Sequence, residues 1–463
     1  MAAFAGLSAW SAAVLRVWGE ERAIQPDAAV SAAAAAANFA DHLEIHPLRL
    51  SSCSSWTRAR AAVATKRSPL SIVVLGGSVT AGCGAAYPLK TCDSLSSWTR
   101  QLHDKLAAML GGSQHVELDV WGKNAIRCTY FTQCTSHKVP TTADVVLLDL
   151  QPNLWFAGQT ACPRCAQSLT ELVQYVRRAA PRAAILFVGW PILRNPRTIE
   201  HTVSDVARAQ HFDAWFASSW VGLARRNYTN GESLHADTVH PSRLGHAMLA
   251  VGVARLLQER LNENLPCDDN ASTIVAPPPL PQSSQEWCYL SAEQLPVPVN
   301  GSAWPTIGSI VSGWSLVDEG GAKGIKKLGF LSASHDDVLR LGPLPQCAHL
   351  AASVGYLQSW RQEFGALRIS CVGSCSCSPP SQVVQTSATR VGYEGGKREL
   401  ENATITSSMA VGVSHHLRGQ CFLQLTHVMP RKPPAPLGGR TRVRVDSLAL
   451  RSSSRGCTFD SKK

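Results

Sequence analysis

The sequence predicts an α/β domain built on a parallel sheet, followed by a separate β-rich domain. Up to residue 266, short apolar segments of strand length alternate with longer segments of helical periodicity. A proline-rich stretch, 276–281, then precedes a half in which short strand-like segments recur and long helical periodicity is absent. The chain has 463 residues, of which 45% are hydrophobic, so each half is long enough to build its own core.

Short apolar strands that alternate with helices indicate a parallel sheet that is covered on both faces. The strands are predicted at residues 71–76, 116–121, 143–150 and 184–188. Helices are predicted where apolar residues recur every third or fourth position, at residues 95–110, 169–178, 203–226 and 244–261. Functional sites of such sheets lie at the carboxyl ends of the strands.

Composition divides the chain into four parts. The first is an N-terminal extension at residues 1–67, which can belong to a targeting or anchor region. The α/β domain at residues 68–266, a Pro/Ser-rich linker at residues 267–286 and a β-sandwich at residues 287–463 follow it. Strands of the β-sandwich are expected at residues 311–317, 337–342, 367–371 and 443–448. No segment reaches the roughly 18 apolar residues that a spanning helix needs, so we expect no stable membrane span.

The 15 cysteines indicate an oxidising compartment. They form close groups in the sequence, namely Cys83 with Cys92, Cys128 with Cys134, Cys162 with Cys165, and Cys371 with Cys375 and Cys377. Cys162 and Cys165 also have the spacing of a zinc half-site, but a second pair is missing, and we expect no metal and no cofactor. The glycosylation sequons at Asn227, Asn270, Asn300 and Asn402 likewise favour a glycoprotein that is secreted or lies in the endomembrane lumen.

The net charge of +11 leaves two interpretations open. The arginines near the end of the chain, Arg440, Arg442, Arg444, Arg451 and Arg455, either form an ordinary solvated surface or attract an acidic glycan. Aromatic residues are not interleaved with basic ones, so we expect no nucleic-acid partner. The tryptophans of the second half, Trp287, Trp304, Trp314 and Trp360, either stack on sugars or pack in the core.

A serine follows the first predicted strand in Gly76-Gly77-Ser78. The glycines permit a tight strand-to-helix turn and leave space for a substrate beside the hydroxyl. Their spacing matches neither a phosphate-binding loop nor a dinucleotide-binding motif. Ser78 is therefore a candidate nucleophile, the alternative being a glycine turn with a chance serine.

Two further motifs supply groups that such a nucleophile needs. Asn153, after the third predicted strand, either forms an Asx turn or donates its amide to an oxyanion. Asp237 and His240 place a carboxylate and an imidazole three residues apart, as an orienting acid and a base require. His235 and His246 are nearby competitors, but His246 falls inside a predicted helix and it is His240 that has an aspartate three residues upstream, so His240 is the preferred base.

The order of these motifs resembles the SGNH (GDSL-type) hydrolase superfamily over residues 68–262. The chain has Gly-Gly-Ser where that superfamily has Gly-Asp-Ser, and Gln151-Pro-Asn-Leu where it has Gly-x-Asn-Asp. The resemblance implies a flavodoxin-like parallel sheet with helices on both faces. It also implies an oxyanion hole formed by the Ser78 amide, the Asn153 side chain and a backbone amide of Gly122, for which Asn124 and Ala125 are the alternatives.

The expected function is that of a serine esterase that uses Ser78, Asp237 and His240. Acetyl or short-chain esters are the expected substrates, and an acylated glycan is the candidate polymer. Two alternatives remain open: an acyltransferase with the same three residues, in which a sugar hydroxyl replaces water, and a non-catalytic glycan-binding protein with a vestigial site.

Overall fold

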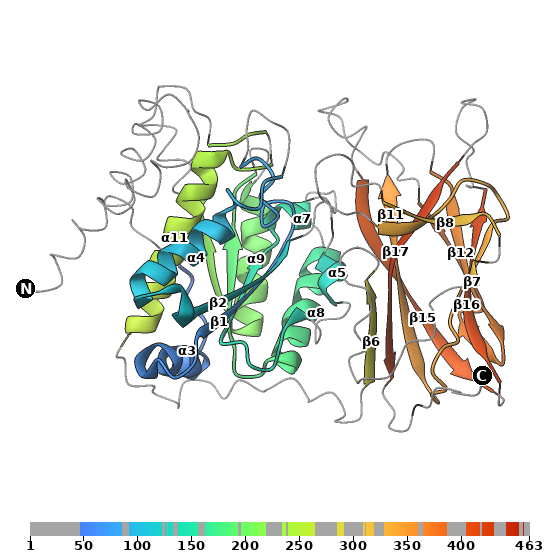
Figure 1. Cartoon of the computed structure of the whole chain (residues 1–463), viewed down its shortest axis with the longest axis horizontal. Helices are drawn as coiled ribbons and strands as arrows, with labels where there is room; N and C mark the ends of the chain where they lie inside the picture. Colours follow the sequence, from blue (N-terminus) through green and yellow to red (C-terminus); the bar gives the residue numbers. More distant parts are fainter. Residues whose placement is uncertain are drawn as a thin grey trace, which may run out of the picture. The chain divides into compact units, whose positions relative to one another are not determined.

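Figure 1 shows the computed structural model of the chain, in which the contacts divide the residues into two compact units. The described residues are 47–85, 92–122, 126, 128–132, 138–155, 163–192, 196–218, 234–237, 239–263, 285–290, 309–310, 312–318, 328–359, 364–386, 404–416, 419–429, 441–452 and 457. The first unit comprises Met1–Asn124, Thr142–Cys162 and Arg182–Ile274, and the second comprises Ala125–Thr141, Pro163–Pro181 and Val275–Lys463. The two units are therefore interleaved in the sequence. The four sequons, the proline-rich stretch, Asn124, Ala125, Cys134 and Cys162 lie outside the described residues.

The first unit contains a five-stranded parallel sheet with the order β2-β1-β3-β4-β5, which confirms the predicted parallel sheet. The strands are β1 (Leu70–Gly76), β2 (Val116–Gly122), β3 (Val145–Asp149), β4 (Ala184–Gly189) and β5 (Asp213–Phe216). This is the order of flavodoxin-like doubly wound sheets, in which the direction of winding reverses between β1 and β3. The ends of β1, β2 and β3 meet there, because Gly76 pairs with both Gly122 and Asp149.

Three helices share one apolar core with this sheet: α3 (Cys53–Thr65), α4 (Trp98–Leu110) and α11 (Arg243–Asn262). Sequence fixes the ends of α4, since the Ser97 hydroxyl accepts the backbone N–H of Arg100 and the helix ends at Gly111 with a φ of 87°. The other described helices of the unit are η1 (Ser113–His115), α7 (Gln151–Trp155) and α9 (Pro196–Gln210). Trp56 and Ala59 of α3 lie within the N-terminal extension predicted over residues 1–67, and both are fully buried in this core.

The helix predicted over residues 203–226 is wrong at residues 211–216. In the structure α9 ends at Gln210, His211 adopts a φ of 48°, and β5 follows at Asp213. A buried carboxylate at the start of a four-residue strand gives no periodic signal. Its stabilisation comes from distant residues, since Asp213 Oδ2 accepts hydrogen bonds from Trp56 Nε1 at 3.1 Å and from Arg260 at 2.7 Å.

The second unit consists of a β-sandwich and two helices from the first half of the chain. The helices are α5 (Cys128–Thr132) and α8 (Pro163–Ala179). One sheet has the order β14-β12-β16-β10-β7, and the other has the order β13-β15-β11-β17-β9-β8, with β6 also paired to β17. The strands are β6 (Gln285–Leu290), β7 (Ser309–Ile310), β8 (Trp314–Asp318), β9 (Leu328–Ser332), β10 (Val338–Leu341), β11 (Leu350–Ser359), β12 (Ala366–Gly373), β13 (Cys375–Ser378), β14 (Ser381–Gln385), β15 (Thr404–His415), β16 (Cys421–Val428) and β17 (Val443–Ser452).

One apolar core joins the two antiparallel sheets. It contains Ile369 of one sheet and Val354 and Val445 of the other, as expected for a sandwich. Trp314 is 3% exposed and belongs to this core, so for this tryptophan the packing interpretation holds. Among the helices that the structure describes, none combines the length and the apolar character of a membrane-spanning segment.

The structure describes four disulfides, which fits an oxidising, extracellular compartment. They are Cys83–Cys92, Cys347–Cys457, Cys371–Cys377 and Cys375–Cys421. Two of them join cysteines that the sequence groups as close neighbours, while Cys375 pairs with a residue of another strand. Three arginines of the C-terminal basic stretch have structural partners: Arg444 binds Asp446, Arg442 lies over the Phe364 ring and Arg451 lies over the Tyr175 ring.

Candidate active site

Ser78 lies on a tight turn directly after β1. The turn is held by backbone hydrogen bonds, among them Gly77 N–H to Asp149 O at 3.2 Å and Cys83 N–H to Ser78 O at 2.9 Å. The two preceding residues are closely packed. A Cβ atom on Gly76 would lie 1.8 Å from Thr80 Oγ1 and 3.0 Å from Asp149 O, and one on Gly77 would lie 2.0 Å from Asn153 Oδ1. A larger residue at Gly77 would therefore require the Asn153 side chain to move.

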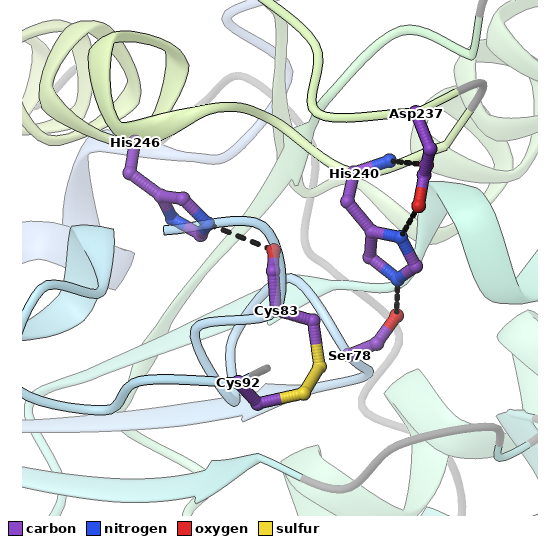
Figure 2. The surroundings of a disulfide bond; sticks show 6 residues. All are labelled: Ser78, Cys83, Cys92, Asp237, His240 and His246. Atoms are coloured by element: carbon purple, nitrogen blue, oxygen red, sulfur yellow. Dashed lines mark hydrogen bonds and ion pairs between the residues drawn. A yellow bond between two sulfur atoms is a disulfide. The ribbon is translucent and has the colours of Figure 1, made fainter. Parts of the chain in front are cut away.

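His240 bridges Ser78 and Asp237, as Figure 2 shows. Its Nε2 atom lies 2.8 Å from Ser78 Oγ, and its Nδ1 atom lies 2.7 Å from Asp237 Oδ2. The other carboxylate oxygen, Oδ1, accepts the backbone N–H groups of Val239 and His240, each at 2.7 Å. The three residues that the sequence singled out are thus brought into one hydrogen-bonded series.

The charge on Asp237 fits the role of an orienting acid. Burial alone would raise the pKa of this carboxyl, but hydrogen bonds from the ring and the backbone of His240, together with the charge of that ring, lower it to about 2. Asp237 therefore stays ionised at neutral pH. An ionised partner on Nδ1 keeps the proton on that nitrogen and leaves Nε2 free to accept the proton of Ser78.

The other two predicted oxyanion residues also lie beside the Ser78 turn. Asn153 is 3% exposed, lies on α7 after β3, and packs its carboxamide against Gly77. Gly122 ends β2, and a Cβ atom there would lie 2.8 Å from Ala81 N, three residues after the serine. The carboxyl ends of β1, β2 and β3 therefore converge on one point, as expected for the site of a parallel sheet.

The two competing histidines have structural partners. His235 is buried, its Nε2 atom is 2.8 Å from Pro191 O, and its ring packs against Trp190. His246 is fully buried, and its Nδ1 and Nε2 atoms are bonded to Trp98 N and Cys83 O. Among the three histidines of this region, only His240 contacts Ser78 in the described structure.

The turn that follows Ser78 also contacts the loop of the base. Gly84 has a φ of 89°, and a Cβ atom there would lie 3.0 Å from the Cβ of His240. The Cys83–Cys92 disulfide lies next to this contact (Figure 2). Ser78 and His240 are thus positioned by two loops that pack directly on each other.

Sequence reasoning missed two buried polar residues at this site, Thr80 and Asp149. Thr80 Oγ1 donates to Asp149 Oδ2 at 2.6 Å, directly beneath the Ser78 turn. The signal was present in the sequence, because Asp149 is the one charged residue in the apolar run 145–150. A carboxylate at the carboxyl end of an otherwise apolar strand is unfavourable unless it has partners.

Solved structures with the same two-part architecture include an esterase. The chain has the fold of a two-domain esterase. That protein, CEX, is described as active on acetylated mannans; its structure with mannopentaose gives a TM-score of 0.53 over 90% of this chain and 100% of CEX, at 13% identity. A second CEX structure gives 0.51 over 88% and 98%, at 12% identity. A peptidoglycan O-acetylesterase gives 0.37 over 46% of this chain and 99% of its own, at 13% identity.

No protein-family model matches the chain, and no curated protein matches its sequence. The similarity to CEX is therefore one of fold, extending across both halves of the chain.

Proposed function

We propose that this chain is a secreted serine esterase of the SGNH type. The observation that carries the proposal is the hydrogen-bonded series from Ser78 Oγ through both ring nitrogens of His240 to Asp237. An ionised carboxylate, an imidazole and a hydroxyl in this order are the parts of nucleophilic acyl transfer. The disulfides support the extracellular location.

The reaction begins with attack of Ser78 Oγ on the carbonyl carbon of an ester. His240 Nε2 takes the hydroxyl proton as the new C–O bond forms, and Asp237 stabilises the imidazolium. The oxyanion accepts hydrogen bonds from the Ser78 amide, the Asn153 carboxamide and a backbone amide at the end of β2, with Gly122 as our candidate. Removal of one such donor typically raises the barrier by about 3 kcal/mol.

The attack gives a tetrahedral intermediate that carries the oxyanion, and its collapse breaks the ester C–O bond. His240 returns its proton to the departing alcohol oxygen, and the acyl group remains bound to Ser78. Water then attacks the acyl carbon while His240 takes one of its protons, and the second collapse releases the carboxylic acid and restores the serine.

An acetylated glycan is the proposed substrate. The support is the fold shared over both halves with an esterase that acts on acetylated mannans. Acetylated mannan is therefore the first polymer to test, beside p-nitrophenyl acetate as a small ester. Hydrolysis and transfer differ in the acceptor, so acetate release in water distinguishes an esterase from an acyltransferase.

Labelling with a fluorophosphonate probe tests the nucleophile. We expect labelling of the wild type at Ser78 and its loss in Ser78→Ala and His240→Ala. His103→Ala is the matched control, because His103 forms an imidazole–carboxylate pair with Asp104 on α4, at 3.2 Å. A folded wild type that is not labelled would favour the vestigial, glycan-binding alternative, and labelling of Ser78→Ala would place the nucleophile elsewhere.

A further inference from the structure

A continuous series of buried hydrogen bonds runs beneath the Ser78 turn. Thr80 Oγ1 donates to Asp149 Oδ2 at 2.6 Å, and Trp98 Nε1 donates to the same oxygen at 3.1 Å. The backbone N–H of Trp98 donates to His246 Nδ1 at 3.2 Å. Since Nδ1 accepts, Nε2 carries the proton, and it donates to Cys83 O at 3.1 Å. Four segments are thereby linked: the turn, β3, α4 and α11.

Both ends of this series lie on the turn that carries the nucleophile. Thr80 follows Ser78 by two residues and Cys83 follows it by five, and Cys83 N–H also donates to Ser78 O at 2.9 Å. Figure 2 shows the bond from His246 to Cys83 beside the bond from His240 to Ser78. The backbone of Asp149 adds a further bond to the turn, because its carbonyl accepts Gly77 N–H at 3.2 Å.

Burial of the polar groups in this series is energetically unfavourable. Asp149, Trp98 and His246 are 0% exposed and Thr80 is 1% exposed. Burial raises the pKa of Asp149 to about 6, although hydrogen bonds from Thr80 and Trp98 act in the opposite direction. Within the described residues, Oδ1 of Asp149 has no hydrogen-bond partner. Unfavourable burial of ionisable groups is concentrated at functional sites, and buried polar networks make a structure rigid.

We propose that Asp149 and His246 are positioning residues that hold the Ser78 turn from beneath, through Thr80 at one end and Cys83 at the other. The inference rests on the proposed function, since it assigns these residues to the geometry of that reaction. Ser78 Oγ must stay 2.8 Å from His240 Nε2 while its amide faces the oxyanion. A displacement of about 1 Å at a reacting group can lower a rate by about a hundredfold.

Thr80 allows a matched test of this proposal. Thr80→Val removes the donor to Asp149 with little change of shape, and Thr80→Ser retains it. Thr99→Val is the control, because Thr99 is also buried, at 3% exposed, adjoins Trp98, and has its hydroxyl bonded to Ser97 at 2.9 Å. The measurements are kcat and KM on p-nitrophenyl acetate, the rate of fluorophosphonate labelling, and the thermal midpoint of unfolding.

We expect Thr80→Val to lower kcat and the labelling rate about ten- to a hundredfold, with little change in KM. Thr80→Ser should recover most of the loss, and Thr99→Val should react at the wild-type rate. His246→Gln, whose amide can donate to Cys83 O but which has no acceptor atom at the position of Nδ1 beside Trp98 N–H, should also react slowly. Wild-type rates in both folded Thr80→Val and folded His246→Gln would overturn the inference.

Hydrogen exchange separates this inference from the proposed function. If wild-type Ser78 is not labelled, the proposed function is wrong, but protection of the backbone amides 77–83 can still be measured. Faster exchange there in Thr80→Val than in Thr99→Val supports the positioning role. Equal exchange in the two variants contradicts it.

Discussion

Asp237 holds His240 at two atoms, one in the ring and one in the backbone. Oδ2 lies 2.7 Å from the ring Nδ1, and Oδ1 accepts the backbone N–H of the same residue, also at 2.7 Å. A single carboxylate therefore fixes both the orientation of the imidazole and the loop that carries it.

Asp237→Asn should separate charge from geometry. The asparagine can still accept the backbone N–H groups, but it cannot stabilise an imidazolium or enforce the correct ring tautomer. We expect kcat on p-nitrophenyl acetate to fall about 10³- to 10⁴-fold. Asp104→Asn, at the surface His103–Asp104 pair, is the control and should keep wild-type kcat. Comparable activity of the two variants would remove Asp237 from the mechanism.

Asn153 should contribute mainly to the transition state. Asn153→Ala is expected to lower kcat about 10²- to 10³-fold with a smaller change in KM, because the oxyanion exists only after attack. Asn153→Asp retains the shape that packs on Gly77 but loses the donor, so it should be at least as impaired. An aspartate variant with near wild-type kcat would show that Asn153 only packs against the turn.

The ionisation of Asp149 should give the first unit a measurable pH dependence of stability. The pKa is raised by burial from 3.8 to about 6, so the folded state holds this proton more tightly than the unfolded state. The resulting stabilisation is complete below about pH 3.8 and is lost as the pH rises through about 6. The loss amounts to about 3 kcal/mol.

Asp149→Asn cannot undergo this loss. Its free energy of unfolding, relative to that of the wild type, should therefore increase by about 2 kcal/mol between pH 4, where the loss has already begun, and pH 7.5. His246, whose pKa burial lowers to about 4, titrates in the same window. Because it is present in both proteins, its effect cancels in the difference. Urea unfolding at both pH values measures the quantity, and a pH-independent difference would contradict the prediction.

The disulfides of the second unit should differ in their contribution to stability. Cys347 and Cys457 are separated by 110 residues, whereas Cys371 and Cys377 are separated by 6. Because a disulfide restricts the unfolded chain more when its loop is longer, replacing the first pair by alanine should cost roughly 5 kcal/mol and the second roughly 2 kcal/mol. Urea unfolding of the two double variants tests this order, which an entropic origin requires.

A chain truncated after Ile274 should be destabilised in α5 and α8. The guanidinium of Arg451 on β17 lies 3.9 Å from the Tyr175 ring of α8 and donates to the carbonyl of Thr132 in α5. Truncation removes Arg451 and with it both contacts. We expect faster hydrogen exchange across residues 163–179 than in the full chain. Unchanged exchange would mean that α8 is stable without the β-sandwich.

The strands β1, β3 and β4 are predicted correctly because their sequence signal lies within each strand. The buried runs in β1, β3 and β4 are continuous in apolar character, and Ser97 and Gly111 are recognisable ends of α4. The strand β5 was missed because its first residue, Asp213, is charged, and the partners that permit its burial lie at Trp56 and Arg260. No window of sequence contains both the charge and its compensation.

The candidate site likewise contains residues that a local motif reveals and residues that only the packing reveals. Ser78, Asp237 and His240 occur in short motifs whose residue types reveal their chemistry, and the structure brings them together. Asp149 and His246 are connected to each other through Trp98, which bonds one with its indole and the other with its backbone. That relation depends on the packing of α4 against β3 and α11, so it could not be read from spacing.

The interleaving of the two units affects how the protein is made. Helix α8 leaves the ribosome before β4 and β5, but its partner Arg451 follows about 270 residues later, which at typical translation rates of about 5–20 residues per second is a delay of roughly 15–55 s. During that interval the first half of the nascent chain carries a helix whose contact residue, Arg451, has not yet been synthesised. Replacement of the β-sandwich by another domain would therefore also remove the contacts of Arg451 with α5 and α8, and the new domain would have to provide others.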